Sequence, residues 1–173
     1  DLVYGETYEL RAWTSMPNGV PDDNVTNDTM TAIISVGMQG SFTIGGTNPD
    51  FTTIQEAVDS LQAIGICDTV TMLIRPGTYT EQIIIPYIPG VFGKQIIFTA
   101  ENGDSTSVIV EYNATHEDSN YVVMFNNAFE ITWEKMTVNA LGTFQAVVFE
   151  LRNFSAANTI QHCAIHGKVT TSN

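Results

Sequence analysis

Five oxygen-bearing side chains lie close together in one acidic loop, "PDDNVTNDT": Asp22, Asp23, Asn24, Asn27 and Asp28. Carboxylate and amide oxygens are the ligands that Ca²⁺ prefers in proteins. The spacing does not match an EF-hand, because the loop has no glycine at its turn and no closing glutamate. A hydrated turn, in which the Asp and Asn side chains hydrogen-bond their own backbone, is the favoured interpretation. A calcium site is the alternative, and we expect no other cofactor.

Three histidines are the other residues that could bind a metal ion. His162 and His166 stand four positions apart in "TIQHCAIHG", and His116 lies in "NATHEDSN". Four-residue spacing places two side chains on one face of a helix, but this segment has the pattern of a strand. A zinc site also needs a third ligand, which His116 could supply only if the fold brought it close. We therefore interpret the histidines as surface residues.

Aromatic side chains are frequent, and exposed aromatic rings can stack on sugar rings. Inward packing in a core is the default expectation, above all for Trp133 and Phe149, which lie in apolar runs. Four tyrosines lie instead at predicted turns or strand ends. We take these as candidate glycan-binding residues: Tyr79, Tyr87, Tyr112 and Tyr121.

The composition excludes two classes of partner. The 173 residues include 19 acidic and 6 basic side chains, giving a net charge of −13. A nucleic-acid-binding protein needs clustered Lys and Arg to replace counterions, and this chain has too few. An anionic membrane surface is disfavoured for the same reason, and no apolar run approaches the roughly 20 residues that span a bilayer. We expect neither nucleic-acid binding nor membrane insertion.

The cysteines and the sequons bear on the cellular compartment. Cys67 and Cys163 are too few for a disulfide framework, and both lie in apolar runs, so we expect buried free thiols. Four Asn-X-Ser/Thr sequons, at Asn24, Asn27, Asn113 and Asn153, hint at export. The chain has no initiator Met and no signal peptide, so we interpret it as a mature piece of a longer protein.

The elements that must position these residues fall into two parts. Within residues 1–40, "ETYELRAW" and "MTAIISVG" have the pattern of strands, joined by the acidic loop. Two strands do not form a stable domain alone, so we predict that they are the C-terminal strands of a β-sandwich. "GMQGSFTIGGTNPD" is predicted to be a glycine-rich linker and turn.

One amphipathic helix is predicted within "FTTIQEAVDSLQ", at residues 51–62. Ile54, Ala57, Val58 and Leu61 form a single apolar stripe. Thr53, with Glu56 three residues later, has the pattern of a capping box, and Gly65 is placed to end the helix.

Short apolar runs separated by turns follow the helix, without further amphipathic helices. "TWEKMTV" matches "TIQHCAI" position for position, with Thr132 and Thr159 offset by 27 residues. A repeat of this length with short strands indicates a solenoid whose coils pair through parallel strands. We predict an all-β fold, in which residues 41–173 form a capping helix and the first coils of a right-handed parallel β-helix. The helix would close the open end of the first coil.

The segments "DFTTIQEAVDSL", "IRPGTYTEQIIIP" and "IIFTAENGDSTSVIV" resemble the N-terminal coils of pectin methylesterases and of wider pectin-lyase-like β-helices. The resemblance covers about residues 44–167. Because the helix and the turn that carry this resemblance are architectural features, the resemblance is evidence for the fold more than for an activity.

The resemblance implies an ester hydrolysis that uses two Asp residues, an Arg and Gln side chains. "FQAVVFELRNFSAANTIQHCAIHG" is similar to the family segment that begins at the first catalytic Gln, which corresponds to Gln145. The family's following Gln-Asp-Thr motif is absent, because Val169, Thr170 and Thr171 stand in its place. Gln145 is therefore taken with the tyrosines as a candidate glycan contact, and no residue as catalytic.

The arrangement of strands before a solenoid also resembles large secreted bacterial surface proteins, including type IX secretion substrates. Those proteins place adhesin-like sandwich modules, some of the CARDB type, before β-helices. We therefore predict a non-catalytic, secreted or cell-surface segment that binds a polysaccharide or cell-surface glycan. Its partners would be further domains of the same chain or a secretion or surface partner. The alternative is a truncated carbohydrate-active enzyme, a pectinesterase or a polysaccharide lyase, with its catalytic residues elsewhere.

Overall fold

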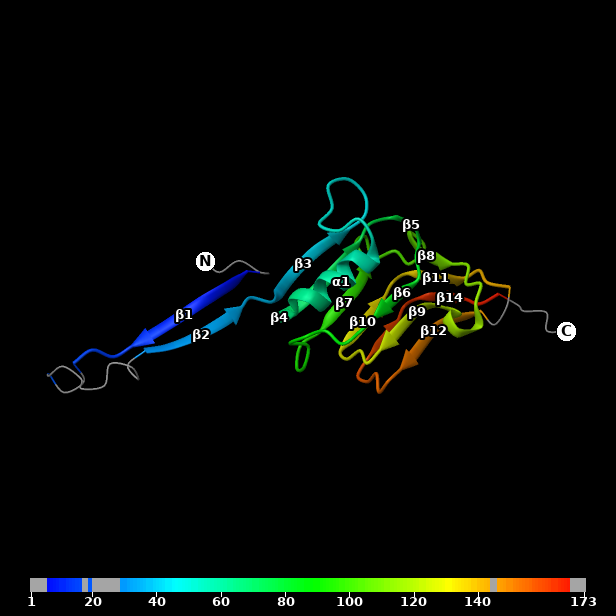
Figure 1. Ribbon diagram of the computed structural model, residues 1–173. Coiled ribbons are helices and arrows are strands. Elements are labelled where there is room, and N and C mark those ends of the chain that lie inside the picture. Colours follow the sequence, from blue (N-terminus) through cyan, green and yellow to red (C-terminus); the bar gives the residue numbers. More distant parts are fainter. Residues whose placement is uncertain (1–5, 17–18, 20–28, 144–145, 169–173) are drawn as a thin grey trace. The chain divides into compact units, whose positions relative to one another are not determined.

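The computed structural model describes residues 6–16, 19, 29–143 and 146–168 (Figure 1). The chain divides into two compact units, Asp1–Val36 and Gly37–Asn173. Within the described ranges, neither helical segment has the length and apolar character that a membrane crossing requires.

The first unit contains one antiparallel hairpin of β1 (Thr7–Trp13) and β2 (Thr29–Ser35). The register pairs Thr7 with Ser35 and Trp13 with Thr29. The two strands predicted here are confirmed. Their membership of a β-sandwich stays a prediction.

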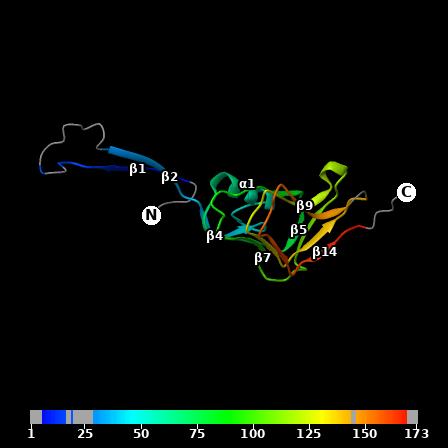
Figure 2. The same cartoon turned by 90° about the horizontal axis from the view of Figure 1, so that it is seen from below.

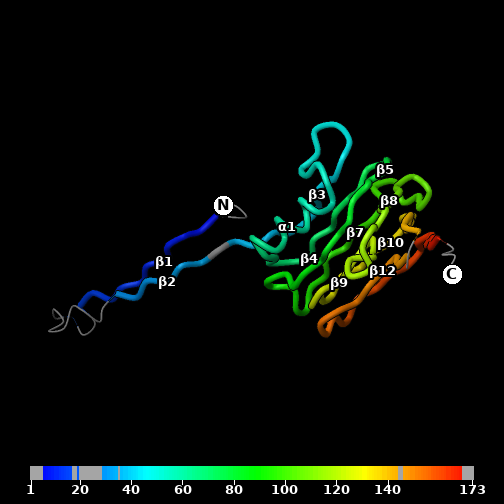
Figure 3. The backbone as a smooth tube through the Cα atoms, turned by 45° about the vertical axis from the view of Figure 1, so that its right-hand side comes forward, coloured from blue at the N-terminus to red at the C-terminus, as the bar shows by residue number. Residues whose placement is uncertain are grey.

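The second unit is a solenoid of parallel strands, and Figures 1 and 3 show its coils lying side by side. Its elements are β3 (Met38–Ile44), α1 (Ile54–Ile64), β4 (Ile66–Ile74), β5 (Gly77–Thr80), β6 (Ile83–Ile85), β7 (Ile96–Ala100), β8 (Val108–Tyr112), the 3₁₀ turn η1 (Glu117–Ser119), β9 (Tyr121–Asn126), β10 (Ile131–Glu134), β11 (Thr137–Ala140), β12 (Val147–Arg152), β13 (Thr159–Gln161) and β14 (Ala164–His166).

Three sheets run along the solenoid. The first sheet has the order β13-β10-β7-β4-β3, the second sheet β14-β11-β8-β5, and the third sheet β12-β9-β6. Every pairing in them is parallel, and each coil visits the three sheets in turn. Figure 2 shows the same unit turned by 90°. The predicted all-β parallel β-helix is confirmed.

The apolar core follows from this stacking. Thr132 of β10 pairs with Thr159 of β13, as the 27-residue repeat predicts. Beside them, one inward-facing row crosses all five strands of the first sheet: Phe42, Met72, Phe98, Trp133 and Ile160. The rings of Phe98 and Trp133 stack with centroids 5.3 Å apart, and both side chains are buried. Each coil therefore stabilises its neighbour through apolar contact as well as backbone hydrogen bonds.

Helix α1 has the predicted apolar stripe, since Ile54, Ala57, Val58 and Leu61 are all buried. It packs against β3, β4 and β6. Gly65 ends it with a φ of 76°, a conformation that glycine adopts without strain.

The predicted capping box forms only in part. The Glu56 backbone N–H donates to Thr53 Oγ1 at 3.1 Å, as expected. The Glu56 carboxylate accepts instead from Thr52, from its N–H at 2.7 Å and from its hydroxyl at 2.6 Å. Thr52 offers this carboxylate two donors, its backbone N–H and its hydroxyl, whereas a capping box would use only the backbone N–H of Thr53.

Two expectations about the second unit are wrong. The segment predicted to be a linker contains β3, which pairs with β4 and buries Met38, Phe42 and Ile44. Its glycines hide the alternating pattern that those apolar residues make. Cys67 and Cys163 are both free, but Cys67 is exposed and Cys163 half-buried. In β4 the side chain of Cys67 lies beside the polar residues Asp68 and Thr69 and is not in the apolar row.

Candidate functional site

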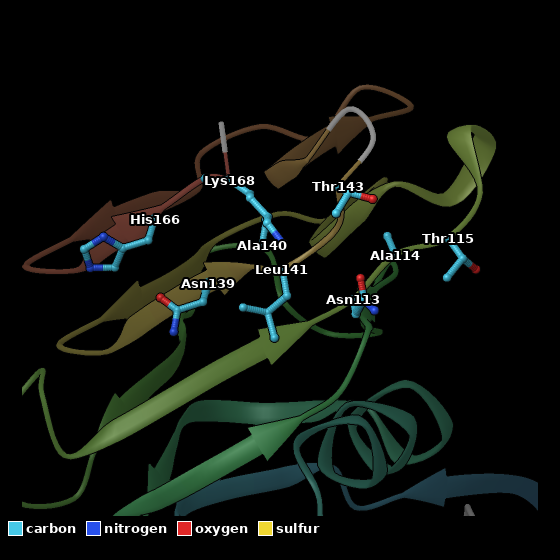
Figure 4. Close-up of a pocket in the computed structure, with 10 residues that line it drawn as sticks. Asn113, Ala114, Thr115, Asn139, Ala140, Leu141, Thr143, His166 and Lys168 are labelled. Atoms are coloured by element: carbon cyan, nitrogen blue, oxygen red, sulfur yellow. The ribbon is translucent and has the colours of Figure 1, made fainter. Parts of the chain in front are cut away.

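A pocket of about 750 Å³ lies where β8, β11 and β14 of the second sheet end (Figure 4). Three successive coils line it, each with the residues at and just after the end of its strand. The lining residues are Asn113, Ala114, Thr115, Asn139, Ala140, Leu141, Thr143, His166, Gly167 and Lys168. Because parallel strands end at the same edge of a sheet, segments far apart in sequence meet here.

The strand register determines which side chains reach this pocket. Glu111, Asn139 and His166 occupy matching positions on β8, β11 and β14, in an outward-facing row. The next matching pair along, Tyr112 and Ala140, packs toward the core. The pocket therefore combines Asn139 and His166 of this outer row with the loops that follow, whereas Glu111, the third member of the row, does not line it.

Close backbone contact holds the following loops together. A Cβ atom at Gly142 would lie 2.8 Å from the carbonyl oxygen of Ala114, so only glycine fits between these two coils. A Cβ atom at Gly167 would lie 3.8 Å from the carbonyl oxygen of Ala146. Gly142 thus lies beside Ala114, and Gly167 lies beside Ala146.

The pocket differs in charge from the rest of the chain. Among the described residues that line it, His166 and Lys168 are the only titratable ones, and none is Asp or Glu. The whole chain has a net charge of −13. The ammonium group of Lys168 can attract a carboxylate, and the amides of Asn113 and Asn139 can bind hydroxyl groups. This arrangement suits an anionic, hydroxyl-rich ligand.

Most of the polar residues predicted to bind ligands lie outside the described residues. They are the loop residues Asp22, Asp23, Asn24, Asn27 and Asp28, together with Gln145. Thr170, which stands where the family has its acid/base Asp, also lies outside the described residues. Two pocket residues are nevertheless their close neighbours in sequence. Thr143 precedes Gln145 by two positions, and Lys168 precedes Thr170 by two positions. In sequence, two residues of the pocket are therefore close to positions that the family resemblance associates with catalysis.

The four candidate tyrosines do not line this pocket. The Tyr79 hydroxyl lies 2.9 Å from the carbonyl oxygen of Arg75 and 3.1 Å from that of Ile44, and burial raises its pKa. Tyr121 is buried, which raises its pKa too, and Tyr112 packs against the core. Tyr87 is the more exposed one and lines a second pocket. Glycan binding by these tyrosines stays a prediction.

The histidines lie at the surface, as predicted. His116, His162 and His166 are exposed, and His162 occupies a turn with a φ of 53°. Within the described ranges, no three His, Cys, Asp or Glu side chains are grouped closely enough to hold a metal ion. Sequence reasoning missed the place of His166 in the pocket. The available signal was the sequence repeat, which pairs His166 with Asn139 of the preceding coil.

Comparison with known proteins connects this fold with pectin-modifying enzymes. No family model matches the chain. A pectinesterase of Aspergillus aculeatus is 31% identical over 121 residues, which are 69% of this chain and 32% of that enzyme. A pectinesterase of Aspergillus niger is 32% identical over 77 residues, which are 44% of this chain and 22% of the enzyme. The chain thus spans a third or less of the length of these relatives.

Crystal structures of the Aspergillus niger pectin methylesterase in two deglycosylated forms share the fold. They superimpose with TM-scores of 0.56 and 0.54 at 16% identity, covering 78% and 79% of this chain and 48% and 49% of theirs. The fold is a pectin-methylesterase-like parallel β-helix. The part of the predicted resemblance that concerned this family is confirmed, whereas the adhesin-like setting stays a prediction.

These comparisons correct one expectation. The chain was predicted not to be an enzyme, and that prediction is wrong, because its relatives in sequence are pectinesterases and point to an esterase. The absence of the Gln-Asp-Thr motif at residues 169–171 weighed too heavily in that prediction, and those residues lie outside the described part of the chain.

Proposed function

We propose that the chain forms substrate-binding coils of a carbohydrate esterase that acts on a pectin-like polysaccharide. The observation that supports this most is the first pocket, whose described lining residues include His166 and Lys168 and no carboxylate, in a chain of net charge −13. A pectin-like chain carries uronic acid groups, some free and some methyl-esterified. A free carboxylate beside the reacting ester would pair with Lys168.

In this proposal the pocket residues bind and orient the polysaccharide. The amides of Asn113 and Asn139 and the hydroxyls of Thr115 and Thr143 would hydrogen-bond sugar hydroxyls. Leu141, which is partly exposed, would contact the apolar face of a sugar ring. Holding the substrate in a fixed position and orientation contributes to catalysis by proximity and orientation.

Ester hydrolysis also needs a nucleophile, an acid/base group and donors for the oxyanion. No described residue that lines the pocket is a carboxylate. By the family resemblance, Gln145 would donate to the oxyanion, and Thr170 stands where the acid/base Asp is expected. The proposed esterase therefore takes its carboxylates from positions other than residue 170.

The test is a binding titration with partly methyl-esterified hexagalacturonate, run beside an assay of methanol release from pectin. We expect Lys168→Ala to weaken binding about twofold to fivefold, which is the effect of losing one exposed ion pair. Lys94→Ala is the matched control, because the Lys94 ammonium donates to the Gly90 carbonyl outside the pocket. Equal affinities for the wild-type chain and Lys168→Ala would refute the assignment of this pocket.

A secreted or cell-surface location accords with this function, and the four sequons support it. An adhesin-like setting for residues 1–40 and a Ca²⁺ ion in the acidic loop are further proposals. Neither is required by the esterase assignment.

A further inference from the structure

A second pocket, of about 580 Å³, lies at a different corner of the solenoid. Three successive coils line it with residues at or just after the ends of β6, β9 and β12 of the third sheet, and α1 adds one residue. The lining residues are Gln62, Pro86, Tyr87, Asn126, Asn127, Asn153 and Phe154. None of them lines the first pocket.

Two aromatic rings of this pocket face solvent. Phe154 is 94% exposed and Tyr87 is 37% exposed. Tyr87 also contacts Phe92 and Phe129, with ring centroids 6.0 Å and 6.4 Å away, so its ring packs against two other aromatic rings. Exposed aromatic side chains grouped beside a concave surface make this pocket a candidate binding site.

Amide side chains provide the polar part of the pocket. Asn153 Nδ2 donates to Asn126 Oδ1 at 2.6 Å, which orients both amides. Asn127 is anchored through its backbone N–H, which donates to the Arg152 carbonyl at 3.1 Å. Carboxamides both donate and accept, so they match the hydroxyl groups of a sugar without requiring a charge.

The charge of this pocket separates its ligand from that of the first pocket. All seven lining residues are neutral. The neighbouring cation, Arg152, is already paired with Glu150 at 2.6 Å. A uronic acid would find no cation in the pocket and would meet the net negative charge of the chain.

We propose that this second pocket binds a neutral oligosaccharide. A sugar ring stacks on Tyr87 or Phe154, and the amides of Gln62, Asn126 and Asn153 bind its hydroxyls. The site does not depend on the esterase function proposed above. It would keep the protein on a polysaccharide matrix while the first pocket engages an acidic chain.

The test is titration of the ¹⁵N-labelled chain with four neutral probes, cellohexaose, xylohexaose, mannohexaose and galactohexaose, and with hexagalacturonate as the acidic probe. We expect at least one neutral probe to saturate and to shift the side-chain amide signals of Gln62, Asn126 and Asn153. Hexagalacturonate should leave those three signals unchanged. Saturation by hexagalacturonate at these signals, or no saturation by any neutral probe, would overturn the proposal.

Variants locate the binding to this pocket. Phe154→Ala and Tyr87→Ala should each weaken binding of the saturating probe about threefold to tenfold, and Tyr87→Phe should retain it. Gln62→Ala, at an exposed helical position, should weaken it without harming the fold. Trp13→Ala is the matched control, because Trp13 is an exposed aromatic residue of β1. Unchanged affinity in both Phe154→Ala and Gln62→Ala would show that the probe binds elsewhere.

Sedimentation distinguishes a sugar site from contact between two copies of the chain. We expect the wild-type chain and Phe154→Ala to sediment alike. A dimer that Phe154→Ala dissociates, with no change in sugar affinity, would assign the exposed rings to self-association and refute the proposal.

Discussion

Asp50 shows how a single residue closes the loop between β3 and α1. Its Oδ2 atom accepts from the Thr43 backbone N–H at 2.7 Å and from the Thr43 hydroxyl at 2.8 Å. The Asp50 N–H donates back to Thr43 Oγ1 at 3.1 Å. The bond from the Thr43 backbone and that from its hydroxyl lower the pKa of Asp50, against a smaller opposing effect of burial.

This lowered pKa predicts how stability depends on pH. The folded state binds the proton less tightly than the unfolded state, so protonation favours unfolding. The contribution of Asp50 is complete above its ordinary pKa of 3.8 and is lost as the pH falls through the lower folded value. We expect the urea midpoint of the wild-type chain to fall as the pH is lowered from about 4 to about 2, and that of Asp50→Asn to fall less. Equal shifts in both would mean that the Thr43 contact does not depend on the charge.

At this scale the sequence identifies buried side chains better than polar contacts. The inward positions of Trp133 and Phe149 were predictable because they lie in alternating apolar runs. Phe149 packs on Trp133, with centroids 6.3 Å apart. Whether the Glu56 carboxylate would accept from Thr52 or from Thr53 was not predictable. Both residues lie within reach, and the local backbone conformation determines which one donates.

Among the elements, α1 depends on residues of the next coil. The carboxylate of Glu81, which follows β5, accepts from the backbone N–H groups of Ile54 and Gln55 at 3.1 Å and 3.0 Å. These N–H groups lie in the first turn, where the helix dipole favours a negative charge. The Gln55 side chain also pairs with β6, since its Oε1 accepts from the Ile84 N–H at 2.9 Å. The helix is thus fixed to the solenoid by polar contacts as well as by its apolar stripe.

Removing the Glu81 carboxylate should loosen this attachment. We expect Glu81→Ala to lower the free energy of unfolding by about 1–2 kcal/mol, the usual worth of a lost helix cap. Hydrogen exchange of the Ile54 and Gln55 amides should become faster. Glu117→Ala is the matched control, because Glu117 is an exposed carboxylate of η1. Stability and exchange that match those of the control would rule out this role of Glu81.

The helix itself was predictable, whereas its anchor was not. Four buried residues at helical spacing within 51–62 determine the element locally. Glu81 lies 27 residues from Ile54, and only the return of the chain after one coil brings the two together. The same limit applies to the first pocket, whose residues come from three coils.

Strand β3 was missed because its period-two pattern is broken by glycine, which gives no hydropathy signal.

For the whole molecule, the distribution of charge is the feature that joins stability and function. Four of the six basic residues form ion pairs with a carboxylate: Arg11, Arg75, Lys135 and Arg152. Lys94 donates to a backbone carbonyl, and Lys168 lines the first pocket. Nineteen acidic residues therefore face few cations, and the compact state places their charges close together.

This excess of negative charge predicts that salt stabilises the fold. Raising NaCl from about 10 mM to about 150 mM shortens the screening length from about 30 Å to about 8 Å. Repulsion is stronger in the compact state than in the expanded chain, so its screening favours folding. We expect the midpoint of urea unfolding to rise with NaCl over this range. Lys94→Gln makes the net charge more negative, −14, and Glu117→Gln makes it less negative, −12. The midpoint of Lys94→Gln should therefore rise more steeply with NaCl than that of Glu117→Gln. Urea adds no ions of its own. A midpoint that stays constant in all three chains would therefore mean that the acidic residues do not repel one another in the folded state.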